Sequence, residues 1–425
     1  MVKSVADLYA LPEQSAEFRT LQKSVNEILT GGVQYSSPMY GSNQQPIQMA
    51  DFDGDGQDEA IVFTVSVGGE FPLKAFVFDK VGDEFVNICA IEGAGHTFDH
   101  VEYAQMDGRG GSEIIIGRQI ANQSVRAIGV YSIEDGRPVE HFTANYSEFT
   151  ITDLDGDGNR DLFLLRFLGD ARTGTAELFR CKNGTMERET ELPVSFGAQE
   201  LRRINNGRLS KDLYGVFVGG IMEEYGSVTD VFCFIEGKFT RISSRETLEL
   251  SAPPVRGYPV FATDVDLDGV LELPHVITLS SQLPDGQESQ YSVISWYNYE
   301  AAKGLTLSTN TYHNFAAGWF LRLPSRMGTD FVVSRAAGLS GASGLIFSLN
   351  NGKNTAGEEL FSLYVYTGSN RSAMLPGTGF FTVSARGETT YVARLGPAAQ
   401  LVKLTQEEVS AMFNYIQVYW NSGET

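Results

Sequence analysis

The chain has 425 residues, of which 42% are hydrophobic, and a formal net charge of −21. A charge this negative argues against nucleic acid and anionic membrane surfaces as partners, because both are themselves polyanions. No apolar run in the sequence is long enough to span a membrane. The length exceeds one ordinary hydrophobic core but suits a ring of repeats, and no composition break or linker divides the chain.

An amphipathic helix is expected near the N-terminus. Between Pro12 and about Thr30, apolar residues recur at helical spacing, and Gly31 and Gly32 then end the helix. The residues on the apolar face are Phe18, Leu21, Val25, Ile28 and Leu29. We predict that residues 1–32 form a helical segment that packs on the following domain.

An acidic loop of nine residues occurs three times, at 51–59, 153–161 and 264–272. Carboxylates stand at loop positions 1, 3, 5 and 9, and glycine stands at position 6, where it permits a positive φ. The carboxylates are Asp51, Asp53, Asp55, Glu59, then Asp153, Asp155, Asp157, Asp161, then Asp264, Asp266, Asp268, Glu272. Position 7 is Gln57, Asn159 or Val270, and we expect it to ligate through its backbone carbonyl. So many oxygen ligands suit calcium, and about three calcium ions are expected.

Two other interpretations of these loops are possible. Acidic surface turns would leave four carboxylates repelling one another without a cation. An EF-hand would need a bidentate glutamate at position 12 and a helix on each side. In this chain position 9 ends the motif, and β-rich sequence such as Ala60–Thr64 follows at once. Each loop is therefore expected to join two strands.

The spacing of the loops indicates a repeat. Asp51 and Asp153 are 102 residues apart, and Asp153 and Asp264 are 111 apart, which is twice a period of roughly 50–55. Degenerate copies are expected between and beyond the acidic loops, so that seven copies start at residues 51, 105, 153, 204, 264, 322 and 382. A period near 50 with short strands is typical of a β-propeller, and we predict an all-β, seven-bladed propeller over residues 33–404.

The four degenerate copies share an arginine at position 5. These residues are Arg109, Arg208, Arg326 and Arg386. Because arginine is always charged and carries several donors, we expect its guanidinium to replace the metal and to pair with the carboxylate at position 9. That carboxylate is Glu113, Asp212 or Asp330 in three of the copies.

Each unit is expected to contain four strands. An inner strand precedes the loop, a second follows it, and the third and fourth form a tight hairpin. Asp-Gly and Asn-Gly turns such as Glu134–Arg137 and Lys182–Thr185 are strong hairpin signals. Aromatic residues on the third strands are expected in the core between blades; they are Phe76, Phe78, Phe179, Tyr364 and Tyr366.

The C-terminal segment 405–425 is predicted to be a helix. Thr405–Glu408 forms a capping box, and an apolar stripe follows at Val409, Met412, Phe413, Ile416 and Trp420. The last unit lacks a fourth strand before this helix. We expect residues near 33–40 to supply it, which would close the ring and remove an exposed strand edge.

The acidic loops resemble those of FG-GAP or VCBS repeats, which occur in integrin α-subunit propellers and bacterial surface proteins. The matched pattern is Asp-x-Asp-x-Asp-Gly-x-x-Asp, at residues 51–59, 153–161 and 264–272. The resemblance implies a propeller fold and calcium in the loops. The Phe-Gly and Gly-Ala-Pro signatures of these repeats are not clearly present in the chain, so the resemblance does not imply the integrin role. A helix followed by a propeller also resembles lipoproteins of Gram-positive bacteria.

Three functions are compatible with these features. The first is a non-enzymatic, calcium-binding module that binds a protein or glycan at the bacterial cell surface. The second is a polysaccharide-acting enzyme on a calcium-stabilised propeller, although the sequence contains no nucleophile elbow, His-rich metal motif or phosphate loop. The third is a scaffold that docks a partner through its terminal helices. We expect a monomer outside the cytoplasm, secreted or lipid-anchored, because calcium sites of this kind suit a calcium-rich exterior.

Overall fold

The computed structural model describes residues 16–121, 125–167, 174–182, 184–242, 252, 255, 257–282, 288–336, 342–352, 354–369 and 377–417. These residues are almost entirely β-structure, as the sequence predicts. The α-helices among them are α1 (Ala16–Ile28) and α4 (Gln406–Met412). No helix in this part of the chain is long and apolar enough to cross a membrane. The chain divides into two compact units, Met1–Ala198 and Gln199–Thr425.

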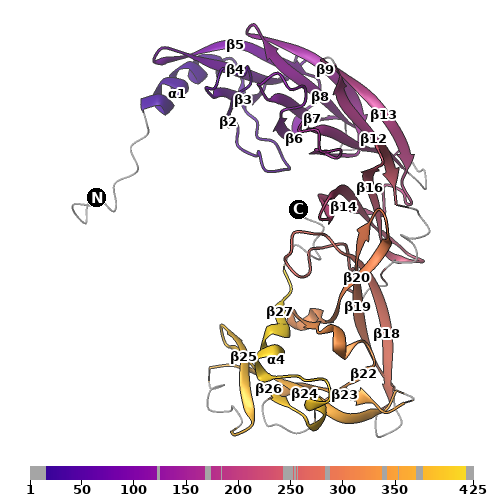
Figure 1. The fold of residues 1–425 in the computed structure, drawn as a ribbon. Coiled ribbons are helices and arrows are strands. Elements are labelled where there is room, and N and C mark those ends of the chain that lie inside the picture. The colour runs from indigo at the N-terminus through magenta and orange to yellow at the C-terminus, as the bar shows by residue number, and fades with distance from the viewer. Residues whose placement is uncertain are drawn as a thin grey trace, which may run out of the picture. The chain divides into compact units, whose positions relative to one another are not determined.

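The first unit contains three antiparallel sheets in chain order (Figure 1). The first sheet has β1 (Gln34–Tyr35), β2 (Ile47–Ala50), β3 (Glu59–Val65), β4 (Leu73–Val81) and β5 (Glu84–Gly93). The second has β6 (Thr97–Ala104), β7 (Glu113–Ala121), β8 (Val125–Glu134) and β9 (Arg137–Tyr146). The third has β10 (Glu148–Thr152), β11 (Asp161–Arg166), β12 (Thr175–Lys182) and β13 (Thr185–Pro193).

The second unit contains three more antiparallel sheets. The first has β14 (Leu201–Ser210), β15 (Leu213–Met222), β16 (Gly226–Ile235) and β17 (Lys238–Arg241). The next has β18 (Leu273–Gln282), β19 (Glu288–Glu300), β20 (Gly304–Asn314), β21 (Trp319–Leu323) and β27 (Phe413–Tyr415). The last has β22 (Phe331–Arg335), β23 (Ala342–Asn350), β24 (Ala356–Thr367), β26 (Thr389–Leu395) and β25 (Phe380–Arg386), in that order across the sheet. Short 3-10 helices are η2 (Phe315–Ala317), η3 (Ser325–Met327) and η4 (Pro397–Gln400).

Hydrophobic cores lie between successive sheets within each unit. One cluster joins Ile61 and Phe63 of the first sheet to Ile114 and Ile116 of the second. The predicted core aromatics fit this arrangement, since Phe78, Phe179, Tyr364 and Tyr366 are buried and Phe76 is half-buried. Four-stranded meanders that pack face to face in chain order are the expected form of propeller blades.

The hairpin predicted at Glu134–Arg137 is present, and Lys182 pairs with Thr185 where β12 meets β13, although Asn183 lies outside the described residues. Between β8 and β9, Asp135 and Gly136 both adopt positive φ, at 48° and 68°. Glu236 and Gly237 do the same between β16 and β17. Paired positive φ values match a type I′ turn, whose twist suits a two-residue hairpin.

The N-terminal helix packs on the first sheet, as predicted. Leu21 and Val25 are buried in a cluster with Ala60, Val62 and Phe78. Phe18 is the exception on the apolar face, since 38% of it is exposed.

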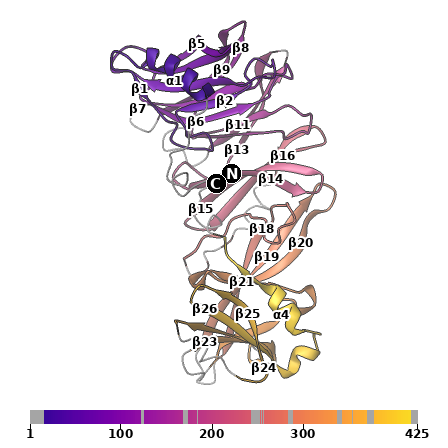
Figure 2. The ribbon, with the colours of Figure 1, turned by 90° about the vertical axis from the view of Figure 1, so that its left-hand side faces the viewer.

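The C-terminal helix is shorter than the sequence predicts. Thr405 caps α4 through a complete capping box, but the helix ends at Met412, and Phe413–Tyr415 continue as strand β27, which pairs with β21. Figure 2 shows α4 beside β25, with which it is in contact. Val409, Met412 and Phe413 are buried, so the apolar stripe is used in packing. Trp420 lies outside the described residues.

The described residues form six sheets, and the predicted count of seven blades is not confirmed. Three of the degenerate copies differ from the prediction. Ile204–Ser210 belongs to strand β14, Arg322–Asp330 connects β21 to a strand of the next sheet, and Thr382–Thr390 forms the β25–β26 hairpin. These segments carry few or none of the loop carboxylates, so spacing alone could not align them.

Residues near 33–40 do not add a strand to the last sheet. Gln34 and Tyr35 instead pair with Val65 and Thr64 of β3, and Tyr40 forms a parallel bridge with His100 of β6. The segment therefore extends the same edge of β3 that β2 covers. The predicted pairing of the two chain ends is wrong for Gln34 and Tyr35.

Candidate metal sites

The first and second acidic loops join two strands, as predicted, whereas the third is preceded by Thr263, which forms only an isolated bridge with Glu272. Residues 51–59 run from β2 to β3, residues 153–161 run from β10 to β11, and residues 264–272 lead into β18. Positions 4 and 6 have positive φ in all three loops, at Gly54 and Gly56, Gly156 and Gly158, and Leu267 and Gly269. The two left-handed residues fold the chain back, so that its acidic side chains converge.

The carboxylate at position 1 fixes this turn. Asp51 accepts hydrogen bonds from the backbone N–H groups of Gly54 at 2.7 Å and Gly56 at 3.0 Å. Asp153 accepts the equivalent bonds from Gly156 and Gly158. The loop backbone is therefore held by a residue that also belongs to the acidic cluster.

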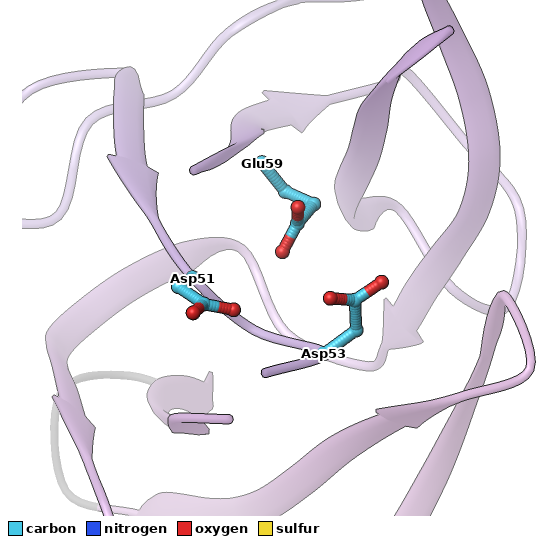
Figure 3. Close-up of side chains that lie close together, drawn as sticks. All are labelled: Asp51, Asp53 and Glu59. Carbon is cyan, nitrogen blue, oxygen red and sulfur yellow. The ribbon is translucent and has the colours of Figure 1, made fainter. Parts of the chain in front are cut away.

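The structure brings together the carboxylates at positions 1, 3 and 9. One oxygen from each of Asp51, Asp53 and Glu59 lies within 4.8 Å of the others, and Figure 3 shows these side chains turned toward one another. The same holds for Asp153, Asp155 and Asp161, and for Asp264, Asp266 and Glu272. The position-5 carboxylates stand outside these groups and accept a hydrogen bond from the position-7 N–H instead.

The position-9 glutamates of the first and third loops each carry a buried oxygen without a partner. Glu59 is fully buried, and its Oε2 accepts a bond from Phe52 N at 2.7 Å, but Oε1 has no hydrogen bond. Glu272 is also fully buried, its Oε2 accepts from Val265 N at 3.0 Å, and its Oε1 has no hydrogen bond. A buried carboxylate oxygen with no partner is costly unless a cation supplies the missing interaction.

Burial shifts the pKa values of these groups upward. Burial, reinforced by the charges of Asp53 and Asp51, raises the pKa of Glu59 to about 7. The same causes, with Asp266, Asp268 and Asp264 as the neighbours, raise the pKa of Glu272 to about 8. Burial also raises the pKa of Asp53, and the charges of Asp55, Asp79 and Asp51 add to it. A bound cation would reverse these shifts, so the first and third loops fit a divalent ion.

The second loop differs because a guanidinium lies among its carboxylates. Arg180, on β12, pairs with Asp155 and lies 3.0 Å from Asp157 through the same nitrogen, while its Nε lies 3.4 Å from Asp161 Oδ1. Burial lowers the pKa of Arg180, but the charges of Asp155, Asp161 and Asp157 outweigh it and raise the pKa overall. The arginine therefore remains a cation inside this cluster.

Arg109, in the degenerate loop at 105–113, does not pair with the position-9 carboxylate. Its guanidinium lies 3.2 Å from Asp107 and 3.2 Å from Glu134, and more than half of the side chain is exposed. Glu113 is buried and accepts a bond from Met106 N at 2.7 Å, and burial raises its pKa to about 7. The predicted Arg109–Glu113 pair is wrong, although the loop has the predicted position between β6 and β7.

The other three proposed metal-replacing arginines also have different roles. Arg208 lies in β14, and its backbone carbonyl accepts a bond from Leu271 N at 2.8 Å. Arg326 pairs with Glu408 of α4 and donates to the carbonyls of Val402 and Lys403. Arg386 lies over the ring of Tyr415 at 5.1 Å. Arg208 lies in β14, Arg326 in η3 and Arg386 in β25, so none of the three stands in an acidic loop.

A repeated β-bulge explains how Arg180 reaches the second loop. The first residue after each loop pairs with an aromatic residue on the following strand, which is the third strand of the predicted unit: Ala60 with Phe78, Ile114 with Tyr131, Leu162 with Phe179 and Leu273 with Tyr297. In all four sheets the register with the following strand shifts directly before that aromatic. Bulges re-aim the side chains near them. The next residues are Asp79, Ser132, Arg180 and Asn298, and they hold equivalent places.

No protein-family model matches the chain, and no curated protein matches it. Among solved structures, a protein from Lactobacillus plantarum is 13% identical, with a TM-score of 0.32 over 75% of this chain and 85% of that one. A rhamnogalacturonan lyase from Bacillus licheniformis is 11% identical, with a TM-score of 0.31 over 84% of this chain and 91% of that one. The Dos1 propeller is 10% identical, with a TM-score of 0.31 over 84% of this chain and 81% of that one. Likenesses at this level carry no argument about activity or ligand.

Proposed function

We propose that this chain is a calcium-binding β-propeller that acts as a non-enzymatic binding module for a protein or glycan at the bacterial cell surface. The observation that carries the calcium part is the buried, unpartnered oxygen of Glu59 and of Glu272 within a group of three carboxylates. Asp51, Asp53 and Glu59 would hold one ion, and Asp264, Asp266 and Glu272 another. Bound calcium would neutralise the clustered charge and fix the loop between its two strands.

The oxygen-only donor set favours calcium over magnesium. Calcium accepts six to eight oxygen ligands in a flexible geometry, whereas magnesium requires a near-ideal octahedron and keeps several waters. The position-7 carbonyls of Gln57 and Val270 remain expected ligands. A site that draws its carboxylates and a carbonyl from one short loop suits the less demanding ion.

The role of the terminal helices supports a binding module over a helix-docking scaffold. Leu21 and Val25 of α1, together with Val409 and Met412 of α4, are buried against sheets of their own units. Apart from Phe18, 38% of which is exposed, the apolar faces are thus engaged in packing, and a partner could dock on the packed residues only by displacing the sheets.

The experiment has two stages. Calcium is titrated into the EDTA-stripped chain by isothermal titration calorimetry, with magnesium as the comparison. The calcium-loaded chain is then screened against a glycan array and a set of bacterial and host surface proteins, with and without EDTA. Saturable calcium binding and a ligand lost in EDTA would support the proposal. Absence of calcium binding would refute the calcium part, and turnover of a polysaccharide in the screen would refute the non-enzymatic part.

A further inference from the structure

The second acidic loop contains a cation that belongs to the chain itself. Arg180 approaches Asp155, Asp157 and Asp161 from β12, and only 18% of its side chain is exposed. Asp161 is buried, and both of its oxygens have partners, Leu154 N at 3.3 Å and Arg180 Nε at 3.4 Å. In the second loop the guanidinium therefore supplies the partner that one buried glutamate oxygen lacks in the first and third loops.

The equivalent residue differs in the other two acidic loops. In the first sheet it is Asp79, a further carboxylate whose charge raises the pKa of Asp53 after the larger effect of burial. In the sheet of the third loop it is Asn298, whose Oδ1 is buried without a hydrogen-bond partner. An oxygen at this place adds a calcium ligand, whereas a guanidinium adds five donors and no acceptor.

The arginine near the third loop does not play the same part. Arg322 lies 3.9 Å from Asp266 Oδ2, and 45% of its side chain is exposed. It approaches one carboxylate from outside, and Glu272 Oε1 remains without a partner. Within the described part of the chain, Arg180 is thus the arginine whose guanidinium lies among three loop carboxylates.

We propose that Arg180 is the resident cation of the second loop, so that the chain binds two calcium ions, in the first and third loops, and not three. This inference rests on the proposed calcium binding. A divalent ion and a guanidinium cannot share the space between Asp155 and Asp161, because both are cations that need the same carboxylate oxygens. The residue after the third-strand aromatic would then decide whether a loop of this type takes calcium.

Native mass spectrometry of the full chain in calcium tests the count. The wild type is expected to bind two ions, Arg180→Asn three, and Arg180→Lys two. Asp79→Arg, the reciprocal change, is expected to bind one. The matched control is Arg188→Asn on β13, which removes the same charge from the same sheet at a residue that pairs with Glu191 rather than with the loop, and it should bind two.

Loop assignment and folding are checked by two further variants and a melting curve. Asp153→Asn should leave the wild-type count at two but should remove the third ion from Arg180→Asn. In EDTA, Arg180→Asn should melt at a lower temperature than the wild type, since its carboxylates then have no cation, and calcium should remove this difference. Three ions in the wild type, or two in Arg180→Asn when it is folded in calcium, would overturn the role of Arg180. No ions in any variant would instead overturn the proposed calcium binding.

Discussion

Asp79 and Arg180 hold the same place in two copies of one structural unit. Each follows the aromatic residue, Phe78 or Phe179, that pairs with the first residue after an acidic loop, and a bulge precedes each aromatic. One copy presents a carboxylate to its loop and the other presents a guanidinium. Both loops keep carboxylates at positions 1, 3, 5 and 9, so the residue at this one place beside the loop changes the electrostatic character of the site.

Glu59→Gln should weaken calcium binding at the first loop by at least tenfold. The variant keeps the size of a fully buried side chain and can still accept from Phe52 N, but it removes the negative charge that the ion requires. Calorimetric titration measures the effect. Asp58→Asn is the matched control, because Asp58 is exposed in the same loop and lies outside the acidic group. Equal affinities for the two variants would contradict the assignment of Glu59 as a ligand.

The calcium-free chain should lose stability as pH rises from about 4.5 to about 8. Burial raises the pKa of Glu59 to about 7 and of Glu272 to about 8, above the ordinary value of 4.5, so the folded state holds more protons than the unfolded state across this range. Stability must then fall with rising pH through that window. Melting curves in EDTA at several pH values check the slope. Calcium should flatten or reverse the slope, and a rise in melting temperature in EDTA over this window would contradict the account.

Leu267→Gly should stabilise the chain by about 1 kcal/mol, because a non-glycine residue at φ of 64° pays a steric cost of roughly 1–2 kcal/mol. The side chain is three-quarters exposed, so little burial is lost. The first and second loops already have glycine here, at Gly54 and Gly156. Chemical denaturation in calcium measures the difference. Leu401→Gly, at another exposed leucine with an ordinary φ of −64°, should not stabilise; similar gains at both sites would contradict the strain argument.

Arg326→Ala should destabilise the second unit by about 1 kcal/mol. The guanidinium joins η3 to α4 through Glu408 and to the carbonyls of Val402 and Lys403, but 40% of it is exposed, so solvent screens much of the ion pair. Hydrogen exchange of the amides of α4 provides a local readout. Arg335→Ala is the control, because Arg335 is an exposed residue of β22 in the same unit. Unchanged exchange in α4 would show that Arg326 does not hold the helix.

The acidic loops, the hairpins and the N-terminal helix could all be predicted from sequence, because each depends on residues close together in the chain. Asp51, Asp53 and Glu59 carry their own spacing, and Asp135-Gly136 specifies its own turn. The structure contains these local elements because the tertiary packing is compatible with the conformations that the local residues favour.

The features that could not be predicted from the sequence depend on contacts between strands that are far apart in the chain. Arg180 lies 25 residues beyond Asp155 in sequence and reaches it only through the β11–β12 pairing and the repeated bulge. The sequence did carry a signal: alignment of the third strands on Phe78, Tyr131, Phe179 and Tyr297 places Asp, Ser, Arg and Asn in one column. The degenerate copies at 204, 322 and 382 do not have the predicted form, because a segment with at most one carboxylate does not fix an alignment.

Thermal melting in calcium and in EDTA tests the central claim most directly, on the wild type and on the double variant Asp51→Asn/Asp264→Asn. An ion present at a hundredfold excess over its Kd stabilises the folded state by about 2.7 kcal/mol, or roughly 5–10 °C of melting temperature for a unit of this size. The account predicts a calcium-dependent rise of that order in the wild type and almost none in the double variant. The same melting temperature for the wild type in calcium and in EDTA would contradict it.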